Sequence, residues 1–286
     1  MNKHMNRGLF PLLLAPLLTA CVGTTGSGIV DFDAYASGPA SASGAPGSAH
    51  SFVFESPYTG YTITLTTATL QIGAVYLDSA PCSGSSAVLP CVNQNAATVA
   101  QVNGGVSGAY GVQTSGVLLD ALSPDPQPFV TGGSGILQQA QSAEVWLSSG
   151  AEVMAIDDLS DASPIAQVAG TAEKDGQAYP FTGTVTIGQN RLLPAANPAL
   201  PGANPICDQR IVRPICLPKS PPVEPEPGVS LHVQVDPRGW FNNVDFSRLA
   251  GPPYQIPDDN NDVTGQDFFQ GIESSSGVYT FRFETP

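Results

Sequence analysis

Hydrophobic and polar residues alternate along several stretches of the chain. Tyr61, Ile63 and Leu65 alternate with threonines, and from residue 68 onwards the hydrophobic residues continue on even positions. Alternation with a period of two is typical of a strand that buries one face. The change of parity predicts a bulge or a corner at Thr66 and Thr67, because a shift of one residue exchanges the two faces of a strand.

The same alternation recurs through 143–147, 166–172, 179–187, 229–235 and 279–283. Between the second and third of these stretches stands Asp175-Gly176, a pair that a tight β-hairpin turn favours. Short helical turns are predicted at 242–249 and 266–274. We therefore predict an all-β fold, an antiparallel β-sandwich with long Pro- and Gly-rich loops whose last strand completes the core.

Segment 194–228 has a different composition, with ten of the 27 prolines of the chain. Proline has no N–H to donate to a strand pairing, so we predict a long irregular excursion there and no strand. The rest of 29–286 is expected to form a single domain around this excursion.

The N-terminus carries a separate pattern. Lys3 and Arg7 precede a short apolar run, 9–18, and the run ends in Leu18-Thr19-Ala20-Cys21. A positive start, an apolar run and small residues form an export signal. The last four residues resemble the lipobox of bacterial lipoproteins. That resemblance implies a signal peptide over 1–20, cleavage before Cys21, acylation of its thiol, and a lipid-anchored tether over 21–28.

The apolar run has roughly ten residues, whereas a membrane-spanning helix needs about twenty. Two or three acyl chains on Cys21 would instead hold the protein at a membrane. In the lipoprotein family, a residue such as Val22 after the cysteine, in place of aspartate, implies export to the outer membrane. We therefore expect a lipid-anchored protein of the cell envelope, attached to the membrane through Cys21.

Charge narrows the choice of partners. The chain has 10 Lys and Arg against 24 Asp and Glu, and removal of Lys3 and Arg7 with the signal leaves 8 against 24, a formal net charge of −16. Nucleic acid would be repelled by such a protein, so no nucleic-acid partner is expected. A protein or glycan partner remains open.

Four cysteines follow Cys21, in two units of equal spacing, Cys82 to Cys91 and Cys207 to Cys216. An exported protein with an even number of cysteines favours structural disulfides. The sequence leaves the pairing open, and we favour the two local loops because each lies in Pro- and Gly-rich sequence. A zinc site is disfavoured, since no two-residue gaps separate the cysteines.

Two groups of residues are candidate metal ligands. Asp258, Asn260 and Asp262 have an alternating spacing that could surround calcium, although Asp and Asn also favour plain turns. His50 and His232 could begin a copper or zinc site, but strand parity favours a strand-end histidine and a surface histidine.

The aromatic residues Trp240, Phe241 and Tyr254 are the candidate binding residues, because large rings stack on sugars and anchor interfaces. A tryptophan buried at the end of the sandwich is the alternative. No G-x-S-x-G, H-E-x-x-H or Walker pattern occurs, so an enzyme is not expected. We expect a binding or structural role in the cell envelope, with metal binding as the alternative and a hydrolase third.

Overall fold

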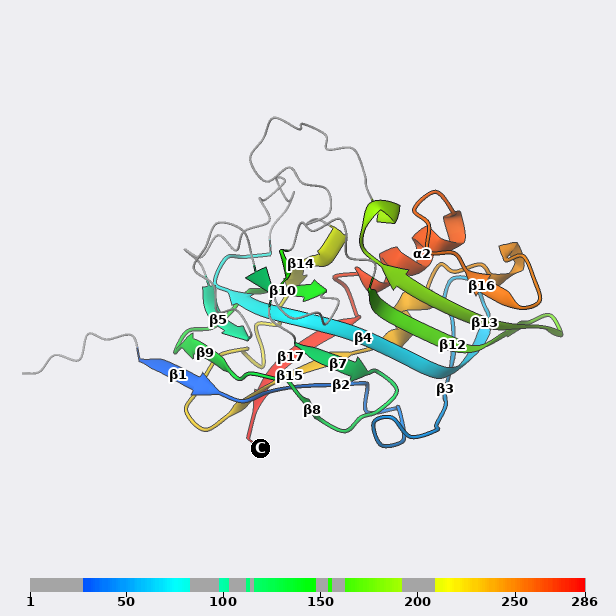
Figure 1. Cartoon of the computed structure of the whole chain (residues 1–286). Coiled ribbons are helices and arrows are strands. Elements are labelled where there is room, and N and C mark those ends of the chain that lie inside the picture. The colour runs from blue at the N-terminus through cyan, green and yellow to red at the C-terminus, as the bar shows by residue number, and fades with distance from the viewer. Residues whose placement is uncertain are drawn as a thin grey trace, which may run out of the picture.

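The computed structural model describes residues 28–82, 98–102, 112–113, 116–147, 154–155, 163–191 and 209–285, in which β-strands predominate (Figure 1). The all-β prediction is confirmed. The lipobox with Cys21 lies outside these residues. No helix within the described ranges combines the length and apolar character needed to cross a membrane.

One long strand, β4 (Thr62–Asp78), runs through the middle of the main sheet (Figure 1). Three strands pair antiparallel along one of its edges: β3 (Phe52–Glu55), β7 (Val117–Asp120) and β5 (Thr98–Val102). Along the other edge lie β12 (Pro164–Lys174) and β10 (Ser142–Leu147). Five segments that are far apart in the sequence are therefore aligned by a single strand.

The predicted parity change in β4 is a bulge. Opposite Ala169 and Gly170 of β12, the pairing passes from Thr67 to Leu65, so Thr66 is an extra residue. The bulge turns the hydrophobic residues on both sides of it toward the core, and Leu65, Ala68, Leu70 and Ile72 all have no exposed surface. The strand continues through this point without a corner.

Strands β12 and β13 (Gln177–Thr186) form the predicted hairpin. Its two turn residues, Asp175 and Gly176, have φ angles of 53° and 78°, the left-handed conformation that a two-residue hairpin turn requires. The sheet continues from β13 to β16 (Tyr254–Ile256), which pairs parallel, and at its other end from β5 to β9 (Gly133–Ile136) and β1 (Ile29–Phe32).

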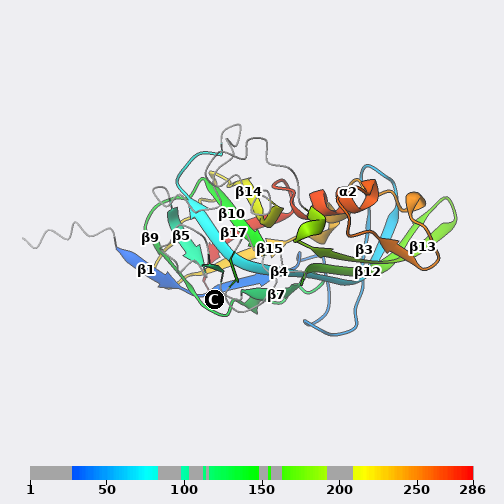
Figure 2. The ribbon, with the colours of Figure 1, turned by 45° about the horizontal axis from the view of Figure 1, so that its top comes forward.

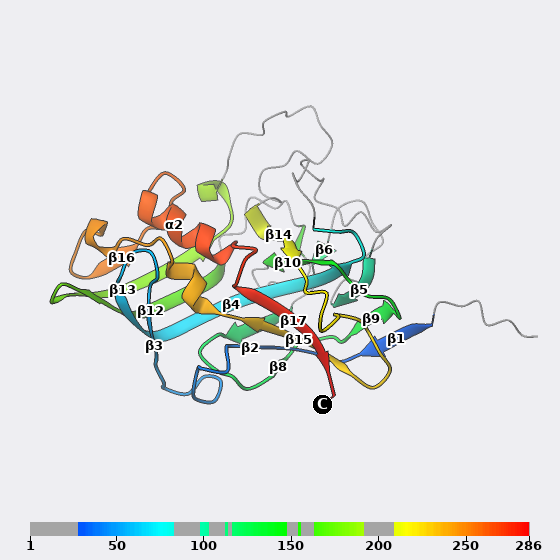
Figure 3. The same cartoon turned by 180° about the vertical axis from the view of Figure 1, so that it is seen from behind.

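A second sheet has the order β17 (Tyr279–Glu284), β15 (Ser230–Val235), β2 (Ala34–Ser37) and β8 (Gln127–Pro128). It lies behind β4 in the view of Figure 1 and in front of it in Figure 3. Buried residues of both sheets belong to one hydrophobic cluster, which includes Leu231 and Val233 of β15. The two sheets thus form sandwich-like layers, although β15 pairs parallel with β2. A small third sheet joins β6 (Val112–Gln113) to β11 (Met154–Ala155).

Short helices close one end of the sandwich. The 3-10 turns η2 (Pro237–Phe241) and η3 (Phe246–Arg248) fall in or next to the predicted helical region 242–249, and helix α2 (Val263–Ile272) overlaps the prediction at 266–274. A further turn, η1 (Gln189–Arg191), follows β13. In Figure 2, α2 lies near this end, toward which the hairpin of β12 and β13 and strand β3 extend.

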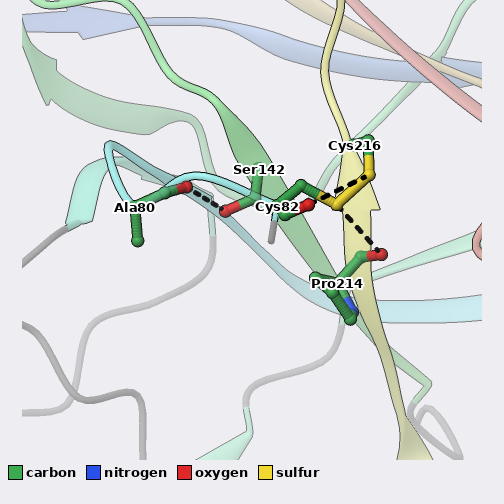
Figure 4. Close-up of a disulfide and its surroundings, with 5 residues drawn as sticks. All are labelled: Ala80, Cys82, Ser142, Pro214 and Cys216. Carbon is green, nitrogen blue, oxygen red and sulfur yellow. Dashed lines mark hydrogen bonds between the residues drawn. A yellow bond between two sulfur atoms is a disulfide. The ribbon is translucent and has the colours of Figure 1, made fainter. Parts of the chain in front are cut away.

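The predicted pairing of the cysteines is wrong, because Cys82 is bonded to Cys216, with 5.2 Å between their Cα atoms (Figure 4). Strand β14 (Ile211–Cys216) pairs with β10, and β10 also pairs with the end of β4. Ser142 of β10 is therefore opposite both Asp78 and Cys216, and the disulfide joins the segment that follows β4 to the last residue of β14. Cys91 and Cys207 lie outside the described residues.

Strand β14 also corrects the prediction of an irregular segment over 194–228. Pro214 sits within the strand, between Val212 and Ile215, which are both buried. The pairing register of β14 with β10 shifts at this point, between Ala143 and Val145. A proline is tolerated where a strand pairing is irregular, because a hydrogen bond is missing there in any case.

Candidate functional site

Three loops meet around a cleft at the end of the molecule from which the β12–β13 hairpin projects. The cleft has a volume of about 380 Å³, which is within the usual range of small-molecule sites. The turn between β3 and β4 contributes Tyr58, Thr59 and Tyr61. Ser247 of η3 and Asp245, the N-cap residue of η3, also line the cleft. The hairpin contributes Lys174, Asp175, Gln177 and Tyr179. We call this site the tyrosine cleft.

The turn that carries Tyr58 is held at both ends. The Ser56 amide donates to the Tyr61 carbonyl over 2.8 Å, and the Gly60 amide donates to the Ser56 carbonyl over 3.0 Å. The Ser56 hydroxyl also donates to the Phe241 carbonyl over 3.1 Å, which ties the turn to η2. Gly60 has a φ of 71°, a conformation that favours glycine. The Tyr58 side chain is presented at the tip of this fixed turn and is 75% exposed.

Lys174 crosses from the hairpin to the neighbouring loop. Its ammonium donates to the Thr59 carbonyl over 2.7 Å and lies 5.1 Å from the centroid of the Tyr61 ring. A cation over an aromatic face is attracted by the negative potential of the ring. Because the Asp175-Gly176 turn directly follows Lys174, the hairpin sets the position of this positive charge.

Asp245 supplies a fixed carboxylate to the lining of the cleft. Its Oδ1 accepts hydrogen bonds from the Tyr61 hydroxyl at 2.9 Å, the Ser247 amide at 3.1 Å and the Ser247 hydroxyl at 2.7 Å. Burial raises the pKa of Asp245, but the bonds from Ser247 and Tyr61 outweigh that effect and leave the pKa below its ordinary value. The carboxylate is therefore ionised at neutral pH.

Aromatic rings pack edge-on against one another at the cleft. Tyr61 packs edge-on against Phe246, with 5.2 Å between ring centroids, and against Tyr179 at 5.9 Å. Tyr179 in turn packs against Tyr254 at 5.2 Å. Tyr61 is buried beneath the cleft, and burial and its bond to Asp245 raise the pKa of its hydroxyl. The hydroxyl therefore stays protonated and remains a donor to Asp245.

The three candidate binding residues of the sequence separate in the structure. Trp240 and Phe241 have no exposed surface, so the surface role predicted for them is wrong and the alternative of a buried tryptophan holds. Tyr254 is half-buried and is not among the residues that line the cleft, but its ring packs against Tyr179. A phenylalanine ring can be buried completely without cost, whereas tyrosine and tryptophan each carry one polar atom that usually needs a partner or water.

The candidate calcium residue Asp258 is held by protein donors. One of its oxygens lies 2.7 Å from the Arg191 guanidinium, and the other accepts from the amide of Thr186 at 3.0 Å and from its hydroxyl at 2.5 Å. The Asn190 side chain donates to the Asp258 carbonyl over 3.2 Å. This network connects the end of β13 to the segment that precedes α2.

The other residues of the acidic loop have local roles. Asp259 accepts from the amide and side chain of Asn261, and Asp262 caps α2 by accepting from the Gly265 amide at 2.9 Å. Asn260, which lies between these two residues in the sequence, is half-buried. Such bonds are the local reason why Asp and Asn favour turns and helix starts.

The two histidines have separate surroundings. His50 contacts the Ser48 carbonyl at 2.7 Å and lies 4.0 Å from Asp120 of β7, whereas His232 lies on β15. Within the described part of the chain, no three His, Cys, Asp or Glu side chains form a group that could hold a metal ion.

The prediction of a surface position for His232 is wrong, because only 6% of the residue is exposed. Its Nε2 lies 2.9 Å from the Ser37 hydroxyl and its Nδ1 lies 2.8 Å from Glu284. Burial, together with the charge of Arg282, lowers the pKa of His232. A serine, a histidine and an acid in this order resemble a hydrolase triad. However, Ser37 is 2% exposed and its hydroxyl donates to the Gly38 carbonyl, so these residues join strands β2, β15 and β17 instead of presenting a nucleophile.

Comparison of the chain with protein-family models, with curated proteins and with solved structures gave no significant match. We therefore infer function from the chemistry of the tyrosine cleft.

The sequence contained part of the signal for this cleft. The hairpin turn at Asp175-Gly176 was predicted, and Tyr58 precedes a glycine that favours a turn. Their meeting with Asp245 could not be predicted, because nearly 120 residues separate Tyr58 from Lys174 and a further 70 separate Lys174 from Asp245.

Proposed function

We propose that the protein is a lipid-anchored component of the cell envelope whose binding role resides in the tyrosine cleft. The lipobox at Leu18 to Cys21 supports the anchor, and Val22 supports sorting to the outer membrane. The acidic composition supports a partner other than nucleic acid.

The observation that carries the binding role is the fixed geometry of the cleft. Lys174, Asp245 and the turn below Tyr58 are each held by hydrogen bonds within the protein. A ligand would therefore meet groups that need little ordering on binding, which reduces the entropic cost of the complex. The Tyr58 ring, in contrast, is left largely exposed, as a contact residue for a ligand would be.

Two experiments test this proposal. Metabolic labelling with a radioactive fatty acid should mark the wild-type protein and leave Cys21→Ser unlabelled. Equal labelling of both chains would reject the anchor.

The cleft is tested by nitration with tetranitromethane, which modifies accessible tyrosine rings. Tyr58 should be nitrated first in the purified protein, and a soluble extract of the cell envelope should slow its nitration. A matched variant, Tyr58→Phe, should lose this early nitration product. Unchanged nitration of Tyr58 at every extract concentration would reject a ligand at the cleft.

A further inference from the structure

The charges around the tyrosine cleft bear on the kind of ligand that it can hold. Lys174 contributes one positive charge, Asp175 and Asp245 contribute two negative charges, and the Arg248 guanidinium lies 3.6 Å from Asp245. The chain as a whole has a formal net charge of −14. An anionic ligand would thus approach a negative protein and meet two carboxylates, which disfavours it.

A cationic ligand is disfavoured for a different reason. Aromatic sites bind cations by placing them over a ring face. In this cleft Lys174 already holds that position over Tyr61, with its ammonium anchored to the Thr59 carbonyl. A second cation would have to displace the ammonium or lie beside it.

The remaining groups suit a neutral ligand with many hydroxyls. Tyr58 offers a largely exposed ring, on which the C–H face of a sugar can pack. Asp245 Oδ1 is already bonded to Tyr61 and Ser247, whereas its Oδ2 lies 3.6 Å from the Arg248 guanidinium nitrogen. This oxygen can accept from a ligand hydroxyl. Lys174 and the Gln177 amide, which also donates to the Ala178 carbonyl at 3.0 Å, add donors to the lining of the cleft.

From this combination we infer that the tyrosine cleft binds a neutral saccharide, an inference that rests on the proposed function. The Tyr58 ring packs against the sugar, and Asp245, Gln177 and Lys174 hydrogen-bond its hydroxyl groups. The volume of about 380 Å³ suits a short segment of one to a few sugar units.

The test is calorimetric titration of the full processed chain in detergent with maltotetraose, mannotetraose and chitotetraose. At least one of these saccharides should bind. Tyr58→Ala should weaken that binding by roughly tenfold or more, because an aromatic contact at the centre of a site carries much of its affinity. Tyr58→Phe, which keeps the ring, should stay within about threefold of wild type, and Asp245→Asn should weaken binding through loss of the charged acceptor.

Leu118→Ala is the matched control, because Leu118 of β7 is similarly exposed, at 64%, and does not line the cleft. It should bind the saccharide as the wild type does. Saccharide binding that is equally strong in Tyr58→Ala would overturn the assignment of the site.

Two further probes separate the saccharide from other ligands of the same cleft. Tetramethylammonium and a neutral Gly-Ser hexapeptide should not bind. If either one binds at the cleft and none of the saccharides does, the assignment of a saccharide ligand is overturned and the proposed binding function still holds. If no saccharide binds and an envelope extract also leaves Tyr58 nitration unchanged, the saccharide and the binding function both fail.

Discussion

Two groups of aromatic residues lie side by side at one end of this protein and are built differently. The core aromatic group consists of Trp240, Phe241, Phe246 and Phe268, none of which is more than 1% exposed. The rim aromatic group consists of Tyr58, Tyr61, Tyr179 and Tyr254, which bury their rings to different degrees. They touch where Tyr61 packs on Phe246.

For the phenylalanines, the difference follows from one oxygen atom. Phe241 packs against Phe268 at 5.3 Å and Phe181 at 5.6 Å, and a hydroxyl in that position would need a partner inside the core. Tyr61 has such a partner in Asp245, at the boundary between core and solvent. The core aromatic group therefore stabilises the fold, while the rim aromatic group presents rings and polar atoms together.

The largest expected effect is on stability in the core aromatic group. Phe241→Ala should lower the free energy of unfolding by about 3–5 kcal/mol, because it removes a fully buried ring and leaves a cavity. Urea unfolding measures the loss. A decrease below about 1 kcal/mol would mean that Phe241 is not a core residue, and the contrast between the two groups would fail.

Removal of the disulfide should lower the stability of the protein and leave the tyrosine cleft unchanged. The double variant Cys82→Ser, Cys216→Ser should lower the free energy of unfolding by about 2–5 kcal/mol, because it releases a constraint on the unfolded chain. Neither cysteine lines the cleft, so nitration of Tyr58 should be unchanged. Peptide mapping without reduction should recover Cys82 joined to Cys216, and recovery of Cys82 joined to Cys91 would contradict the strand order around β10.

A smaller effect is expected where the two groups meet. Tyr61→Phe keeps the ring but removes the hydroxyl that donates to Asp245, and should cost about 0.5–1.5 kcal/mol in urea unfolding. The pKa of the Asp245 carboxyl should rise toward its ordinary value, because one of the hydrogen bonds that lower it is lost. An NMR titration of that carboxyl gives the direction, and an unchanged pKa would show that Tyr61 does not hold Asp245.

The second sheet provides a pH test that involves neither aromatic group. The folded protein lowers the pKa of His232 below its ordinary value of about 6.5, so neutral His232 is favoured by folding. Its contribution to stability is complete above pH 6.5 and is lost as the pH falls through the lowered pKa. Glu284 has a lowered pKa too and adds a loss at more acidic pH. His232→Gln should make the free energy of unfolding less dependent on pH just below 6.5. An unaltered pH dependence in that range would contradict this assignment.

The smallest effect on stability is expected at Tyr58. Because its ring is 75% exposed, Tyr58→Ala should change the free energy of unfolding by less than about 0.5 kcal/mol. Urea unfolding of Tyr58→Ala and Phe241→Ala under the same conditions compares the two groups directly. A loss of more than about 2 kcal/mol would place Tyr58 in the fold and remove the distinction between the two groups.

Local features of the fold could be predicted from the sequence. The hairpin at Asp175-Gly176 follows from the left-handed conformation that these residues tolerate. The bulge at Thr66 follows from a change of hydrophobic parity that a regular strand cannot accommodate. Both signals lie within a few residues of the structure that they determine.

Features set by strand order could not be predicted. Cys82 meets Cys216 only because β10 pairs with both β4 and β14. The contact of the His232 side chain with Ser37 of β2 depends likewise on a parallel pairing between distant segments, and this pairing buries a face that alternation marks as polar. The tyrosine cleft belongs to the same class, because its three loops meet only after β3, β12 and β13 are placed around β4.

In the proposed function, this protein binds its ligand with the rim aromatic group and not with the core aromatic group. The most direct measurement is amide hydrogen exchange of the processed chain with and without the best-binding saccharide of the calorimetric series. Protection should appear in peptides that cover 56–61, 174–177 and 245–247, and should disappear in Tyr58→Ala. Protection confined to other peptides, or protection that persists unchanged in Tyr58→Ala, would contradict the claim.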